Sequence, residues 1–331
     1  MSDLLLIIPT FVVLVLAVLL VRRVRQANDR LVRLLAICGF SFSALIAILL
    51  TLSLGYRFWY FHRPQPAATR QILFEGVTYI RDVRTDPRPM VIHVLLIDLS
   101  APGIGFLVTP GQPVEEYDIP ARTTGQFLQE FGVQLAINGG GFHPWRSVML
   151  WDYYPHVGDG VTIEGFASSK GTVYSTSHRE FPTLYLAADN KASFDKPIGA
   201  VYNAISALFY IVKDGKWVQP RRDYYRNYGG LNPRTVLALD KDAHTLILIV
   251  VDGRQPNYSE GATLEEMAAI AIQYGADVAV NQDGGGSSVM VMQGASNVPV
   301  LLSSPIDSYI PGRERALGNH LGIFARPVKA N

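Results

Sequence analysis

Two long apolar segments open the chain and set its first sixty residues apart from the rest. Residues 4–21 carry no charge and are apolar except at Pro9 and Thr10, and residues 34–54 are interrupted only by small and hydroxyl side chains. A helix needs about 20 apolar residues to cross the hydrocarbon core of a bilayer. The pattern therefore predicts two membrane-spanning helices.

The short segment between the two apolar runs indicates their orientation. Residues 22–33 carry five arginines and one acidic residue, Asp29, and short arginine-rich loops stay in the cytoplasm. We therefore expect a transmembrane helical hairpin over residues 1–61 with both ends facing outward, a proline-containing linker over 62–69, and one domain over 70–331 on the extracytoplasmic side. A cleaved signal peptide is disfavoured, because no basic region precedes the first run.

Beyond the linker, alternating and short apolar runs predict a domain built mainly from strands. Runs at 72–83 and 90–99 are typical of strands, whereas residues 123–131 and a segment with a capping box at Thr263 and Glu266 are typical of helices. Segments 182–194 and 205–218 predict hairpins, and 151–177 predicts a long loop region. The expected fold class is α+β, with a mixed sheet and few helices.

Residues 232–254 predict a strand–turn–strand unit that begins beside Arg234 and ends in Asp252-Gly253-Arg254. Antiparallel pairing would bring these two ends together at one edge of a sheet. Two arginines would then share that edge with a carboxylate, and the guanidinium fork matches pairs of phosphate oxygens.

Composition adds two limits. The net charge of +1 gives no bulk argument for a nucleic-acid partner. The single cysteine, Cys38, lies inside the second apolar segment. The domain after the linker therefore has no disulfide and must be stabilised by core packing, which about 260 residues can supply.

Residues 276–294, ADVAVNQDGGGSSVMVMQG, carry the densest polar chemistry of the chain. A strand delivers Asn281 and Asp283 to three adjacent glycines, and two serines follow before a second apolar run. Three glycines in a row are costly to order, so a fold tolerates them where backbone must approach another group closely or adopt positive φ. The stretch predicts a polar binding floor, with an ordinary glycine-rich hairpin as the alternative.

A second stretch, residues 133–144, repeats the pattern, because an apolar strand again ends in an asparagine, Asn138, followed by three glycines. Free N–H groups in glycine turns form concavities that hold anions. Phe142 and Trp145 follow and would either line a sugar site or fill the core.

The order of these motifs resembles the phosphodiester glycosidase family. The resemblance rests on NGGGF at 138–142, NPRT at 232–235, VVDGR at 250–254, S-x-G at 259–261, TLEEMA at 263–268, NQDGGGSS at 281–288 and GRER at 312–315 with a later asparagine. It covers most of residues 72–327. Two departures are the third glycine, Gly141, and Gln282 at a position that is commonly apolar. The resemblance implies a glycosidase that hydrolyses a sugar-1-phosphodiester, on a phosphorylated glycan or glycolipid.

That chemistry needs charge stabilisation on the departing phosphate and a carboxylate or an activated water at the sugar carbon. We expect Asp283 and Asp252 to be catalytic. The expected substrate-binding residues are Arg234, Arg254, Asn138, Gly139, Gly140, Ser259, Asn281, Gly284, Gly285, Gly286, Ser287, Ser288 and Arg315.

Two other functions stay open at this stage. Asp252 and Asp283 would bind a divalent cation in a metal-dependent phosphodiesterase that cuts the P–O bond; apart from this cation no cofactor is indicated. A non-catalytic module that binds anionic polysaccharide is the second. The outward-facing topology favours a substrate in the cell envelope, such as an exopolysaccharide or a lipid-linked glycan, and no protein partner is indicated.

Overall fold

The computed structural model describes residues 4–26, 29–149, 152–176, 181–221 and 229–328. The chain divides into two compact units, Met1–Pro64 and Gln65–Asn331.

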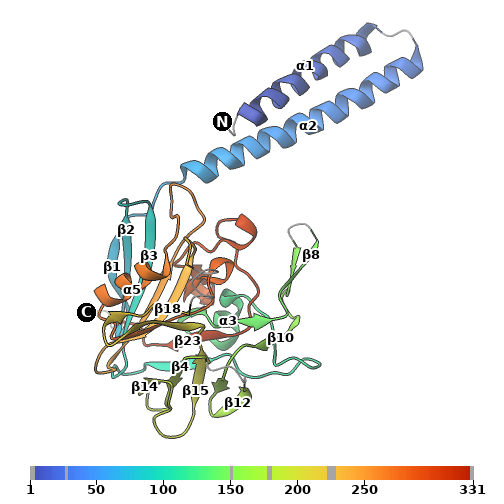
Figure 1. Ribbon diagram of the computed structural model, residues 1–331. Coiled ribbons are helices and arrows are strands. Elements are labelled where there is room, and N and C mark those ends of the chain that lie inside the picture. Colours follow the sequence, from blue (N-terminus) through green and yellow to red (C-terminus); the bar gives the residue numbers. More distant parts are fainter. Residues whose placement is uncertain (1–3, 27–28, 150–151, 177–180, 222–228, 329–331) are drawn as a thin grey trace. The chain divides into compact units, whose positions relative to one another are not determined.

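The N-terminal unit consists of two helices, α1 (Leu4–Gln26) and α2 (Arg30–His62), which lie side by side (Figure 1). Asp29 caps α2 by accepting a hydrogen bond from the N–H of Leu31 at 2.8 Å. Among the helices that the structure describes, only α2 is long and apolar enough to cross a membrane. One candidate span is thus found where the sequence predicts two, and the two-span hairpin stays a prediction.

The second unit is built on a sheet of eight antiparallel strands in the order β1-β2-β3-β19-β18-β20-β16-β17. Their bounds are β1 Thr69–Phe74, β2 Val77–Arg84, β3 Met90–Asp98, β16 Phe209–Lys213, β17 Lys216–Trp217, β18 Arg234–Leu239, β19 Thr245–Val251 and β20 Val278–Asn281.

Two five-stranded antiparallel sheets follow, ordered β22-β21-β6-β23-β4 and β12-β11-β15-β13-β14. Their bounds are β4 Gly105–Val108, β6 Leu135–Asn138, β11 Ala167–Ser169, β12 Thr172–Ser175, β13 Thr183–Leu186, β14 Ala192–Phe194, β15 Asn203–Ser206, β21 Met290–Gln293, β22 Pro299–Leu301 and β23 His320–Phe324. The smaller pairings involve β5 Ile119–Pro120, β7 Phe142–His143, β8 Arg146–Met149, β9 Asp152–Tyr154 and β10 Gly160–Ile163.

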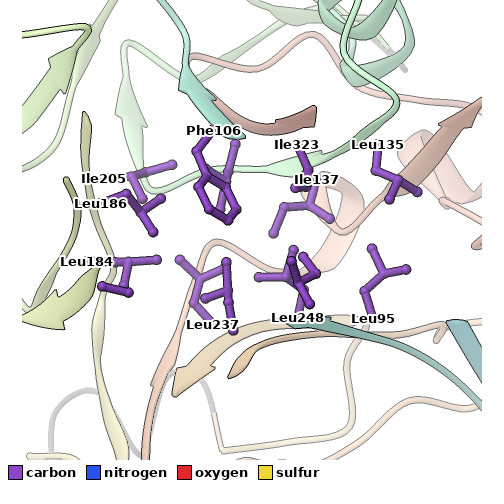
Figure 2. Packing of buried hydrophobic residues seen from close by; sticks show 14 of the residues in the cluster. Leu95, Phe106, Leu135, Ile137, Leu184, Leu186, Ile205, Leu237, Leu248 and Ile323 are labelled. Carbon is purple, nitrogen blue, oxygen red and sulfur yellow. The ribbon is translucent and has the colours of Figure 1, made fainter. Parts of the chain in front are cut away.

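The main core lies between the three large sheets. Figure 2 shows Leu95, Leu237 and Leu248 of the eight-stranded sheet facing side chains from the other two sheets. The facing residues include Phe106, Leu135, Ile137, Leu184, Leu186, Ile205 and Ile323. Each Å² of apolar surface that these side chains bury stabilises the folded state by about 25 cal/mol. This hydrophobic contribution is the dominant favourable term in the folding of a domain without disulfides.

Two helices begin at capping boxes, of which the one at Thr263 was predicted from the sequence. In α3 (Thr124–Phe131) the capping residue is Thr123, and in α5 (Leu264–Gln273) it is Thr263; each forms a full capping box with the residue three positions on. Leu264 and Met267 of α5 belong to the second core, on the other face of the eight-stranded sheet. The described residues also include three short 3₁₀ turns: η1 Gly285–Ser287, η2 Ala295–Asn297 and η3 Asp307–Tyr309.

The fold confirms the α+β class, and it corrects two predictions. Every pairing between the named strands is antiparallel, whereas a mixed sheet was expected. The segment 151–177, expected as a loop, contributes strands β9 to β12. These strands have only three or four residues, which is too short for a period of two to show in sequence.

Strand register places the ends of β18 and β19 as the sequence predicts. Arg234 pairs with Val251 at one end of the β18–β19 ladder, so Asp252 and Arg254 follow directly beyond it. On its other side β18 pairs with β20, where Val236 lies opposite Asn281. The chain therefore brings residues 232–234, 252–254 and 281–283 to the same edge of the sheet.

Candidate active site

The three-glycine turn after β20 lies against three arginines. An added Cβ on Gly284 would lie 4.0 Å from Cδ of Arg234, and one on Gly285 would lie 2.9 Å from Nη2 of Arg254. A Cβ on Gly286 would overlap Nη2 of Arg315. The absence of side chains at these positions therefore lets the three arginine side chains approach one stretch of backbone.

Arg234 and Arg254 come close enough to affect each other. Arg234 is 2% exposed and donates from Nη2 to the carbonyl of Gly230 at 2.7 Å and from Nε to that of Ala262 at 3.2 Å. Burial lowers the pKa of Arg234 to about 10, and the positive charge of Arg254 adds to this effect. Arg254 itself donates from Nη2 to Oδ1 of Asn232 at 2.8 Å. An anion bound near both guanidinium groups would relieve their repulsion.

Asp283 lies on the same turn and is partly buried. Its Oδ1 accepts the N–H of Gly284 at 2.9 Å, and its carboxylate is hydrogen-bonded by Ser287. Burial raises the pKa of Asp283, while the hydrogen bond from Ser287 and the charge of Arg315 oppose that rise. Arg315 is connected to this group through a long hydrogen bond of 3.5 Å from Nη1 to the Ser287 hydroxyl.

Asp252 lies in a different environment from the one we expected. Its carboxylate is buried, with Oδ2 3.0 Å from Nε2 of His93 and Oδ1 accepting the N–H of Ser304 at 2.8 Å. Nδ1 of His93 in turn lies 2.8 Å from the Tyr79 hydroxyl. Burial raises the pKa of Tyr79 to about 12, so the hydroxyl stays protonated. Both oxygens of the Asp252 carboxylate therefore have partners inside the protein.

Ser259 belongs to the same buried network. Its hydroxyl donates to the carbonyl of Asp252 at 2.6 Å and accepts the N–H of Val91 at 3.0 Å. The network ties the Asp252–Arg254 corner to strand β3. Arg254 has φ of 58°, in the left-handed region, so this corner has to be fixed from outside. Ser259, which we expected to bind substrate, thus connects the backbone at Asp252 to β3.

The first glycine turn also has a positioning function. The side chain of Asn138 uses all four of its hydrogen-bonding sites. Its Nδ2 donates to the carbonyls of Asp283 and Gly139, and its Oδ1 accepts from Thr235 and from the N–H of Val289. Asn138 therefore links the first glycine turn to the backbone at Asp283.

The N–H groups of Gly139 and Gly140, expected to be free for an anion, are both engaged by Asn319. Gly139 donates to the backbone carbonyl of Asn319 at 2.9 Å, and Gly140 donates to its Oδ1 at 3.0 Å. At the second turn the N–H of Gly285 donates to the carbonyl of Pro233 at 2.9 Å. Anion binding at this edge thus depends on the arginine side chains more than on bare backbone.

Three further polar side chains of residues 281–288 are buried without a full set of partners in the described part of the protein. Both amide atoms of Gln282 and Oδ1 of Asn281 have no hydrogen-bond partner there, and neither has the hydroxyl of Ser288. Gln282 is fully buried, and its Oε1 would lie 3.5 Å from a Cβ on Gly140. An apolar residue at 282 would leave no such groups, so this departure from the family pattern makes the layer beneath the site polar.

Sequence reasoning missed a second carboxylate beside Asp283. Glu164 follows strand β10, and its negative charge contributes to the raised pKa of Asp283. Its Oε2 would lie 2.8 Å from a Cβ on Gly141, and its Oε1 is 4.0 Å from Nδ1 of His143. No motif marks Glu164 in the sequence, because it lies in the segment that was expected to be a loop. The third glycine of the first turn, by contrast, leaves the space that the Glu164 side chain needs.

A cavity of about 280 Å³, which we call the Trp145 cavity, opens beside Arg315. Trp145 and Tyr153 stack in its wall with centroids 5.3 Å apart, and the Arg315 guanidinium lies 5.3 Å from the centroid of the Trp145 ring. Asp307, which also lines the cavity, pairs with Nε of Arg315 at 2.8 Å. Aromatic faces and charged groups together are suited to a sugar ring, which has an apolar face and polar edges.

Within the described ranges, no group of three or more His, Cys, Asp or Glu side chains lies together in a way that would hold a metal ion. Each oxygen of Asp252, one of the expected pair of metal ligands, has a hydrogen-bond partner inside the protein.

The site thus combines a carboxylate of raised pKa, a cluster of arginines and an aromatic cavity. These groups are chemically suited to a phosphorylated sugar. Residues 119–324, more than half of the chain, match the phosphodiester glycosidase family, and the chain belongs to this family. Membership supports a glycosidase-type function. No curated protein sequence matches the chain.

Solved structures share the fold. A hypothetical protein from Synechocystis superposes with a TM-score of 0.59 at 15% identity, over 79% of this chain and 64% of that one. This chain therefore corresponds to less than two thirds of the Synechocystis protein. The catalytic domain of zebrafish N-acetylglucosamine-1-phosphodiester alpha-N-acetylglucosaminidase, auto-inhibited by its pro-peptide, superposes with a TM-score of 0.55 at 20% identity. That match covers 80% of this chain and 86% of the zebrafish domain.

Proposed function

We propose that this protein is a membrane-anchored hydrolase that releases a sugar from a sugar-1-phosphodiester by breaking the bond between the anomeric carbon and oxygen. The observation that carries the proposal is the convergence of Arg234, Arg254 and Arg315 on the glycines that follow Asp283. One anion and one reacting carbon fit such a site. The zebrafish relative is named for a reaction of this class, which supports the proposal.

In this proposal the guanidinium groups of Arg234 and Arg254 stabilise the phosphate that departs. Charge that develops on a leaving group is stabilised most by donors that are already in place. The leaving phosphate needs no proton, because it is already a stable anion. Asp283 acts in its ionised form at the anomeric carbon, and Glu164 takes the second role that we expected of Asp252, which is to position water or a sugar hydroxyl.

The remaining expected residues take supporting roles. Ser287 and Arg315 favour the ionised form of Asp283, and the Trp145 cavity holds the sugar. Asn138, Gly139, Gly140, Ser259 and Asp252 position the reacting groups, while Asn281 and Ser288 lie buried beneath the floor. Helix α2 anchors the chain, the second unit acts on the extracytoplasmic side, and the substrate is an envelope glycan or glycolipid.

The test is hydrolysis of a panel of sugar-1-phosphodiesters by the purified full chain in detergent, in water labelled with ¹⁸O. Label in the released sugar supports the proposal. Label in the phosphate, together with loss of activity in chelator, would instead establish the metal-dependent phosphodiesterase. Ligand binding without release of any sugar would instead indicate a non-catalytic module that binds anionic polysaccharide.

Replacement of Ser287 by Ala tests the state in which Asp283 acts. The Ser287 hydrogen bond opposes the rise that burial imposes on the pKa of Asp283, so its loss raises that pKa further. The ionised form then needs a higher pH, and we expect the acidic limb of the kcat/KM profile to move to higher pH while the alkaline limb stays. Movement of the alkaline limb alone would mean that Asp283 acts as a proton donor.

A further inference from the structure

A second cavity, of about 440 Å³, adjoins the Trp145 cavity, and we call it the Arg122 cavity. Its lining includes Ala121, Arg122, Gln126, Gln129, Glu130 and Val157. Val157 lines both cavities, and Thr123 of the Trp145 cavity directly follows Arg122 in the chain. The two cavities are therefore neighbours on the surface, and Arg315 lines the first of them.

The arginine of the second cavity is held in place, and its Nη2 donates to Gln112 at 3.3 Å and to Glu130 at 3.2 Å. Nε of Arg122 pairs with Glu130 at 2.9 Å, and its guanidinium lies 5.6 Å from the centroid of the Phe131 ring. Nη1 is buried without a hydrogen-bond partner among the described residues. Because Glu130 balances the charge of Arg122, the cavity is suited to a neutral ligand with oxygen acceptors more than to an anion.

The other lining groups match the surface of a sugar. Gln126 and Gln129 bring carboxamides that both donate and accept, as sugar hydroxyls do. Val157 and Ala121 supply apolar contact for the C–H face of a pyranose ring. Oε1 of Gln126 is already occupied by the N–H of Thr123 in the capping box of α3, so its side chain is held rather than free to rotate.

The position of the Arg122 cavity indicates which part of the substrate would lie in it. In the proposed reaction the phosphate lies at Arg234 and Arg254, and the reacting sugar lies toward Arg315 and Trp145. The Arg122 cavity adjoins the Trp145 cavity at Val157, so it lies next to the position assigned to that sugar, and neither Arg234 nor Arg254 lines it. We propose that the Arg122 cavity binds further sugar residues on the glycosyl side, so that the substrate is an oligosaccharide or polysaccharide chain ending in the scissile phosphodiester. This inference rests on the proposed function.

The test compares two diesters with the same scissile bond, cleaved by the full chain in detergent. One carries the single sugar that is cleaved best in the panel, and the other carries that sugar extended by two or three residues on its glycosyl side. We expect KM for the extended diester to be about tenfold lower, as two or three added hydrogen bonds would give. A gain only on extension at the phosphate side would overturn the proposal.

Gln129→Trp fills the cavity at an exposed position of α3 and provides the matched variant. We expect it to remove the tenfold advantage of the extended diester and to leave kcat/KM for the single-sugar diester unchanged. Gln71→Trp, at an exposed position of edge strand β1, is the control and keeps the advantage. Equal changes for both diesters in Gln129→Trp, or none for either, would contradict the proposal.

A binding measurement tests the Arg122 cavity separately from the proposed catalytic function. If the wild-type chain releases sugar from no diester, the proposed function fails. Calorimetric titration with phosphate-free oligosaccharides, the same sugars as in the extended diesters, then tests the Arg122 cavity alone. Binding by the wild type that weakens about tenfold in Gln129→Trp supports sugar binding in the Arg122 cavity. No binding, or equal binding by both chains, refutes it.

Discussion

Asp283→Asn is expected to lower kcat for sugar release by about 10³-fold or more while the fold stays intact, because the amide can neither ionise nor attack the anomeric carbon. Stability should be kept or improved at neutral pH. Burial raises the pKa of Asp283 above that of the unfolded chain, so the folded state favours the uncharged form and loses stability as pH rises through the raised pKa. Asparagine imitates the uncharged form and removes that loss.

Two further aspartate variants serve as controls for Asp283→Asn. Asp242→Asn, at an exposed position in the turn between β18 and β19, should change neither activity nor stability. Asp252→Asn should lower the free energy of unfolding by about 1–3 kcal/mol, because it disturbs the buried contacts to His93 and Ser304. Thermal melts and single-turnover rates measured on all three variants separate the two aspartates. Wild-type turnover in Asp283→Asn would remove this residue from the mechanism.

Arg254→Met is expected to lower kcat/KM for the diester by about 10²–10³-fold, the usual effect of losing a fixed donor to a developing anion. Arg254 Nη2 lies beside the position of Gly285, and its charge is felt by the buried Arg234. The same change should weaken the binding of inorganic phosphate. We expect phosphate to raise the melting temperature of the wild type, by preferential binding to the folded state, and to do so less for the variant.

The controls for this experiment separate charge from shape. Arg254→Lys keeps the charge and loses the planar fork, so an intermediate activity indicates that paired hydrogen bonds to phosphate oxygens matter. Arg70→Met removes an exposed charge on edge strand β1 and should leave the phosphate effect unchanged. An undiminished phosphate effect in Arg254→Met would show that the anion is bound elsewhere.

The sequence predictions that the structure confirms were based on patterns among a few neighbouring residues. The capping box at Thr263 predicts where α5 begins, and the Asp214-Gly215 turn predicts the β16–β17 hairpin. Residues 232–254 form one antiparallel ladder whose ends meet as expected. Each of these patterns acts over a few neighbouring residues, so nothing distant has to be known.

The roles within the site depended on distant partners. Asp252 and Asp283 follow similar apolar strands, and sequence alone gives them equal standing as catalytic residues. Asp252 faces His93 of β3 and the backbone of Ser304, whereas Asp283 faces Ser287 and the charge of Arg315. Only the packing of β3 beside β19 reveals that the first carboxylate is already hydrogen-bonded.

The sequence by itself determined the α+β class, the capping box of α5, the β18–β19 ladder and the family motifs around the two glycine turns. Tertiary structure decided that Asn138, Gly139 and Gly140 hold the backbone, and that Glu164 from a weakly patterned segment comes beside Asp283. The physical reason is that a polar side chain's function depends on whether its hydrogen bonds are satisfied inside the protein. That balance is set by residues far away along the chain.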